Sequence, residues 1–104
     1  MIVLDEIKIK QYCSEYNFHY RYFGNNALIM TGVDEWRIRA IDKDKILVEH
    51  YNKLGNKSGK MQFHSQRYAK DLDYIFKNII KPHSSYNSVF QEAFRIKYLL
   101  ENHI

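Results

Sequence analysis

The stretch EWRIRAI, residues 35–41, alternates between polar or charged and apolar side chains as far as Ala40. Successive side chains of an extended strand point to opposite faces, so Trp36 and Ile38 share one face. Arg37 and Arg39 share the other face. A period of two over a short run predicts a strand with one face in a core and one face in solvent. The middle of the chain is therefore expected to be sheet.

Four further segments with strand character flank this stretch, and turn residues separate them. The segments are Phe18–Phe23, Ala27–Thr31, Ile46–Tyr51 and Met61–Arg67. Gly and Asn residues at 24–26 tolerate positive φ and favour a tight hairpin. Strands joined by such short links usually pair with their neighbours in the chain. We therefore predict a five-stranded antiparallel meander.

Helical spacing of apolar residues is found on both sides of the predicted sheet. The first helix is expected from Asp5, as N-cap, to about Asn17. A second is expected to begin after Asp71 and to stop at Lys81-Pro82, and a third to run from a capping box at 88–91 to about Glu101. The predicted fold class is α+β, with an N-terminal helix, a five-stranded antiparallel meander and two C-terminal helices packed on one sheet face.

Composition indicates a folded protein of ordinary domain size. The chain has 104 residues, of which 45% are hydrophobic and 15% aromatic, so we expect a single domain over residues 1–104. The net charge of +4 is spread along the chain without a long run of like charges, which permits either a nucleic acid or an acidic protein as partner. Cys13 is the sole cysteine, which excludes an internal disulfide.

Two features of the chain bear on its origin and location. Its richness in Ile, Lys, Asn, Tyr and Phe fits AT-rich codons, and so a low-GC bacterium or a phage or mobile element living in one. Neither a signal-peptide pattern nor an apolar run of membrane-spanning length is found in the sequence. We therefore expect a cytoplasmic protein without a membrane partner.

The sheet face opposite the predicted core is the first candidate binding surface. Alternation sends Phe63 towards the helices and places polar side chains on the other face. The candidate binding residues are Arg21, Arg37, Arg39, Tyr51, Gln62, His64 and Gln66. Arg presents planar donors to phosphates or carboxylates, Gln hydrogen-bonds base edges or peptide groups, and Tyr stacks. The alternative is an ordinary solvated sheet face.

The predicted last helix is the second candidate surface. Its apolar residues cover more than the usual arc of a surface helix. An aromatic stripe is formed by Phe90, Phe94 and Tyr98. This stripe is either an interface, most simply of a homodimer, or part of the core of the monomer.

Signatures of metal and catalytic sites are absent from the sequence. The five histidines are at 19, 50, 64, 83 and 103. Zinc ligands usually lie a few residues apart in the sequence, and these histidines show no such spacing to one another or to Cys13. No nucleophile elbow or phosphate-binding glycine loop occurs. We predict no metal, cofactor or catalytic residue, while a metal site assembled by the fold from distant residues stays open.

Three functional hypotheses follow. The leading one is a small non-enzymatic protein that binds a macromolecule, protein or nucleic acid, and acts on a host factor. The second is a nucleic-acid-binding protein or metal-independent ribonuclease on the polar sheet face, with His64 or His19 as acid and base and Arg37 and Arg39 holding phosphate charge. The third is a homodimeric regulatory module assembled through the last helix.

Overall fold

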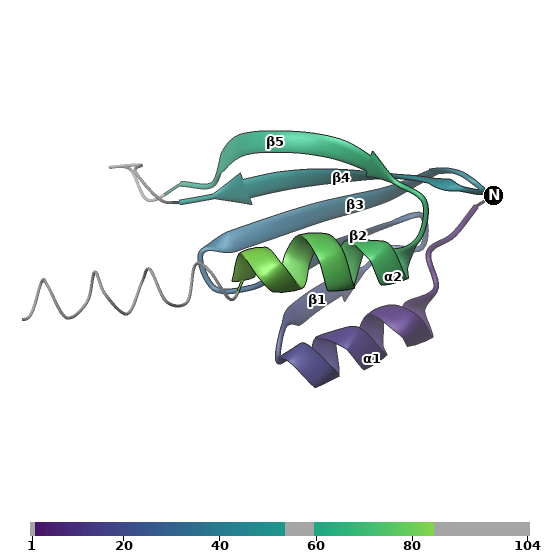
Figure 1. Cartoon of the computed structure of the whole chain (residues 1–104), viewed down its shortest axis with the longest axis horizontal. Coiled ribbons are helices and arrows are strands. Elements are labelled where there is room, and N and C mark those ends of the chain that lie inside the picture. The colour runs from purple at the N-terminus through teal and green to yellow at the C-terminus, as the bar shows by residue number, and fades with distance from the viewer. Residues whose placement is uncertain (1, 54–59, 85–104) are drawn as a thin grey trace, which may run out of the picture.

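A computed structural model describes residues 2–53 and 60–84 of the chain (Figure 1). Its elements are α1 (Glu6–Tyr16), β1 (His19–Tyr22), β2 (Asn26–Met30), β3 (Asp34–Asp42), β4 (Lys45–Asn52), β5 (Gln62–Ala69), α2 (Leu72–Tyr74) and η1 (Ile75–Ile80). The strands form one sheet in chain order, and every neighbouring pair is antiparallel. This confirms the predicted α+β order of N-terminal helix, five-stranded meander and C-terminal helix. The predicted helix at 88–101 lies outside the described residues.

Local signals in the sequence set the ends of α1. The Asp5 side chain accepts a hydrogen bond from the backbone N–H of Lys8 at 3.1 Å, which satisfies one of the free donors of the first turn. The helix ends at Asn17, which adopts a left-handed conformation with φ 62°. Asn tolerates this conformation better than most residues. The predicted helix at the N-terminus and its cap are confirmed.

Both helices cover the same face of the sheet, where they bury its apolar side (Figure 1). The sheet contributes Ala27, Ile29, Trp36, Ile38, Ile46 and Val48 to this core, and the helices contribute Ile9, Tyr12, Cys13, Ile75, Phe76, Ile79 and Ile80. Phe76 is fully buried, and its ring stacks on that of Tyr12 with centroids 4.8 Å apart. Burial of such a ring contributes roughly 1.5–3 kcal/mol to folding. The core thus joins the first and last described helices to each other and to the sheet.

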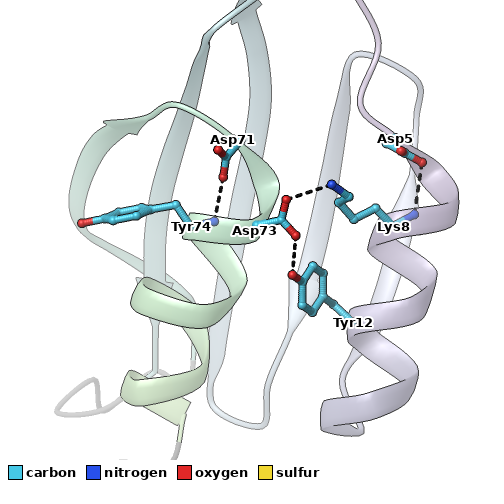
Figure 2. A network of polar contacts seen from close by, with 6 residues as sticks. All are labelled: Asp5, Lys8, Tyr12, Asp71, Asp73 and Tyr74. Carbon is cyan, nitrogen blue, oxygen red and sulfur yellow. Dashed lines mark hydrogen bonds and ion pairs between the residues drawn. The ribbon is translucent and has the colours of Figure 1, made fainter.

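A polar contact ties α1 to α2 beside this core (Figure 2). Asp73 accepts a hydrogen bond from the Tyr12 hydroxyl and forms an ion pair with Lys8, whose Nζ lies 2.8 Å from Oδ2. The two donors lower the pKa of Asp73, and the same contact raises the pKa of Tyr12 to about 12. Both shifts favour a protonated tyrosine beside an ionised aspartate, which is the arrangement that the structure holds.

The C-terminal helix continues past its predicted end. We expected a stop at Lys81-Pro82, but residues 81–84 are still α-helical, so this prediction was wrong. The preceding element η1 is a wider π-helix, in which the N–H of Lys81 bonds to the carbonyl of Phe76. A regular α-helix would bring the ring of Pro82 against the carbonyl four residues earlier. The wider turns come directly before the proline, and the extra length brings His83 to the sheet.

Candidate functional site

The register of the sheet defines its outer face, the face opposite the helices. Paired residues of neighbouring strands share a face, so one row across the sheet contains Arg21, Leu28, Arg37, Glu49 and Gln66. The neighbouring rows contribute Arg39 and Tyr51. Neither α1 nor the described part of the C-terminal helix covers this face (Figure 1). Five of the seven predicted binding residues are therefore together on an open sheet surface.

Aromatic and cationic side chains are in direct contact on the outer face. The Arg37 guanidinium lies 3.9 Å from the centre of the Tyr51 ring, and its Nε lies 2.7 Å from a carboxylate oxygen of Glu35. The hydrogen bond that Arg37 donates to Glu35 is the main cause that raises the pKa of Arg37. Tyr51 in turn meets the edge of Phe63, with ring centroids 5.6 Å apart. The Arg37 guanidinium, the Tyr51 ring and the Phe63 ring therefore form one continuous layer of contacts on the outer face.

A shallow hollow of about 370 Å³ lies beside this layer. Its lining includes Phe23, Leu28, Arg37, Arg39 and Glu49. The ring of Phe23 is 57% exposed, which is a high value for so large an apolar side chain. The hollow thus presents an apolar ring next to two guanidinium groups.

A bulge in β5 changes the face of two predicted residues. Ser65 pairs with His50 and Phe63 pairs with Tyr51, so His64 is one extra residue between them. His64 consequently lies on the helix-covered side, where its ring stacks on His50, and Phe63 points outward with 54% exposure. The prediction that His64 joins the arginines and that Phe63 enters the core was wrong.

The same shift places Gln62 on the helix-covered side. Gln62 pairs with Asn52, and Asn52 pairs with Asp34 on the face that carries Trp36. The prediction that Gln62 shares the outer face was therefore also wrong. Strict alternation from Arg67 backwards cannot detect a bulge, because a single inserted residue reverses every assignment before it.

Buried polar side chains gather at the end of the sheet where β3 begins and β4 ends. Among the described residues, the buried polar ones are Asp34, His50 and Asn52. Nε2 of His50 lies 2.7 Å from Oδ1 of Asp34. The His50 ring stacks on Trp36 at 4.1 Å on one side and on His64 at 5.4 Å on the other. A polar pair under aromatic cover is unusual in a core and needs a reason.

His83 reaches this pair from the C-terminal helix. Its ring meets His50 edge-on at a centroid distance of 4.5 Å, and its Nε2 lies 3.5 Å from Oδ1 of Asp34. That nitrogen is buried and has no hydrogen-bond partner. Asp34, His50 and His83 offer three potential metal-ligand atoms within 4.8 Å of one another, and we call them the Asp-His-His cluster.

The protonation of His50 follows from its surroundings. Burial is the largest effect and lowers its pKa, the hydrogen bond to Asp34 opposes this, and His83 and His64 lower the pKa further. The imidazole is therefore neutral at pH 7. Since a carboxylate oxygen accepts, His50 donates its Nε2 proton to Asp34.

A cleft of about 330 Å³ opens beside the cluster. It is lined by Trp36, Val48, His50, His64, Ser65, Arg67, Asn78, Ile79 and His83. The sequence spacing gave no signal for this site, because Asp34, His50 and His83 are far apart in the chain and zinc ligands usually lie close together. A different signal was present in the sequence. Asp34 is two residues before Trp36 and His50 is two residues after Val48, so period-two alternation places both polar side chains on the core-facing side of the sheet.

Comparison of the chain with protein-family models, curated proteins and solved structures found no match. In the described part of the chain, no helix combines the length and apolarity needed to cross a bilayer.

Proposed function

We propose that this protein is a non-enzymatic binding protein whose outer sheet face holds single-stranded nucleic acid. The observation that carries the proposal is the pairing of exposed aromatic rings with arginines on one open sheet surface. Phe23 and Phe63 are more than half exposed. Arg37 and Arg39 line the hollow beside Phe23, and Phe63 contacts Tyr51, over whose ring the Arg37 guanidinium lies.

Stacking explains why exposed rings on a sheet favour single strands. Unpaired bases present flat faces, and each base that stacks on an aromatic side chain contributes about 1–3 kcal/mol. A sheet surface spaces its side chains regularly, so successive bases can meet successive rings. Phe23 and Phe63 provide rings without a polar group, and the guanidinium of Arg37 stacked on Tyr51 adds a planar cation.

Charge favours a polyanion over a protein with a mixed surface. The Glu35 carboxylate on this face is already paired with Arg37 in an ion pair. In the part of the chain that the structure describes, Arg21 and Arg39 form no ion pair, so both guanidinium groups can meet phosphates. The whole chain carries a net charge of +4. Arginine suits phosphate because its planar donors bind two oxygens at once.

The test is fluorescence anisotropy of labelled single-stranded RNA and DNA oligomers titrated with the full chain at several salt concentrations. We expect affinity to fall with salt, and Arg39→Ala to reduce the salt slope by about 0.7, the loss of one phosphate contact. Phe63→Ala should weaken binding by about 5-fold to 150-fold, the equivalent of one lost stack. Lys10→Ala is the matched control, because Lys10 is exposed on α1 on the other side of the sheet.

The proposal fails if no oligomer binds at low salt, or if Lys10→Ala weakens binding as much as Arg39→Ala. A folded protein without affinity for nucleic acid would direct the search to a protein partner, and the host-factor hypothesis would then be the better one. An origin in a phage or mobile element and a cytoplasmic location are part of the same proposal.

The two alternatives have less support. A ribonuclease that combines His64 with Arg37 and Arg39 would need groups from opposite faces of the sheet, whereas His19 is on the outer face with the arginines. Comparing RNA cleavage by the wild type and by His19→Ala tests the version that remains. The second C-terminal helix and the homodimer stripe at Phe90, Phe94 and Tyr98 fall outside the described residues and stay predictions.

A further inference from the structure

We propose that the Asp-His-His cluster binds one divalent transition-metal ion of the zinc type, with a coordination position left open towards the neighbouring cleft. The proposal is independent of the nucleic-acid face, because the cluster lies on the other side of the sheet. Three residues far apart in the sequence supply it: Asp34 at the start of β3, His50 near the end of β4, and His83 in the C-terminal helix.

The ligand chemistry selects the class of metal. Two imidazole nitrogens and one carboxylate oxygen suit zinc, cobalt, nickel and related ions, whereas calcium and magnesium prefer oxygen alone. Three protein ligands leave the fourth tetrahedral position for water or another small ligand. The adjoining cleft, which is lined by Ser65, Arg67 and Asn78, has room for such a ligand.

One distance within the cluster matches that of a metal site, and its three ligand atoms all lie within 4.8 Å of one another. Metal–ligand bonds of about 2.0–2.2 Å at tetrahedral angles place neighbouring ligand atoms about 3.3–3.5 Å apart. Oδ1 of Asp34 and Nε2 of His83 are 3.5 Å apart, which fits this spacing. Oδ1 of Asp34 and Nε2 of His50 are 2.7 Å apart, so a metal would replace this hydrogen bond and separate the two atoms by about 0.6 Å more.

His83 supplies a second and independent observation. As a whole its side chain is 35% exposed, but Nε2 is buried, faces Asp34 and lacks a hydrogen-bond partner. A buried polar atom without a partner costs about 1–3 kcal/mol. Coordination of a metal by this nitrogen removes that cost, and it explains why the helix brings an imidazole to a buried carboxylate.

The test is metal titration of the full chain after removal of bound metal with a chelator and dialysis. Cobalt(II) is the probe, because nitrogen and oxygen ligands in tetrahedral geometry give it intense visible absorption. We expect one equivalent of cobalt to produce this spectrum and one equivalent of zinc to abolish it. Zinc should also raise the urea midpoint of the wild type, since a ligand that binds the folded state stabilises it.

Variants assign the site. His83→Gln should weaken cobalt binding at least about tenfold, because it removes a direct ligand. Loss of a residue that only hydrogen-bonds a metal ligand already weakens metal binding by about 10-fold to 100-fold. His19→Gln is the matched control and should leave binding unchanged, since His19 is an exposed histidine on the other face. Circular dichroism confirms that both variants are folded.

The proposal is overturned if the folded wild type gives no cobalt spectrum and no shift of its urea midpoint with zinc. It is equally overturned if His83→Gln binds cobalt like the wild type, or if His19→Gln abolishes binding. Should His83→Gln fail to fold, the two wild-type measurements decide the question by themselves. Failure of nucleic-acid binding has no bearing on any of these outcomes.

Discussion

The Asp34–His50 pair should show strong energetic coupling, which a double-mutant cycle measures in the presence of a chelator. The variants are Asp34→Val, His50→Leu and the double variant, each with an apolar side chain of similar shape. The side chains are 0% and 7% exposed and their polar atoms are 2.7 Å apart, so the hydrogen bond is formed almost entirely out of water. Removal of one partner should therefore cost more than removal of both.

The two single variants are expected to differ because His50 is neutral. Asp34→Val takes the acceptor from a neutral imidazole, and an unmade hydrogen bond of this kind costs about 1–3 kcal/mol. His50→Leu removes the hydrogen-bond donor of the buried Asp34 carboxylate, which costs about 3–5 kcal/mol of folding free energy. The double variant removes both polar groups and should lose mainly the stacking of His50 on Trp36, about 0.5–1.5 kcal/mol.

Urea unfolding is the assay, with two probes. Trp36 is the sole tryptophan and touches His50, so its fluorescence reports on the cluster, while far-UV circular dichroism reports on the whole fold. The single variants together should lose at least about 4 kcal/mol and the double variant at most about 1.5 kcal/mol, so the reasoning predicts a coupling energy of at least about 2.5 kcal/mol between Asp34 and His50. Additive losses in the double variant would refute it, because they would mean that Asp34 and His50 act independently.

Three further predictions concern stability. Tyr12 has its pKa raised to about 12 mainly by Asp73, so its contribution is complete below about pH 10 and is lost as the pH rises to about 12; Tyr12→Phe should flatten this alkaline loss in urea titrations. Gly32→Ala should cost about 1–2 kcal/mol through backbone strain alone, since Gly32 has φ +92° and a Cβ there would meet nothing within 4 Å; an unchanged urea midpoint would contradict this. Asp5→Ala should cost about 1 kcal/mol through loss of the N-cap, and Asp5→Asn should retain most of that stability.

Local patterns sufficed to predict most of the fold. The alternation in residues 35–41 and the Gly and Asn turns each act within a few residues of chain, so they depend little on distant parts of the fold. The caps at Asp5 and Asp71 are equally local, and both accept the expected backbone hydrogen bonds. Pro82 was one exception beside the bulge in β5, because the cost of a proline in a helix depends on the turn before it, and a π-helix there is not visible in the sequence.

The Asp-His-His cluster could not be predicted in the same way. Its members are distant in the sequence, and each has an ordinary local interpretation, as a turn residue, a strand residue or a connecting residue. What brings them together is the antiparallel pairing of β3 with β4 and the docking of the C-terminal helix over the end of that pair. Histidine spacing is a good guide only where one short segment supplies several ligands.

The bulge in β5 links the two candidate sites through a single residue. Without it, strict alternation would send Phe63 into the core side and His64 to the arginine surface, as we expected. With it, the outer face has an exposed ring next to Tyr51, and the helix-covered side has an imidazole stacked on His50. A bulge that re-aims side chains is a common device next to functional sites. The same inserted residue therefore supports both proposals: it adds a stacking platform on one face and polar cover for the buried cluster on the other.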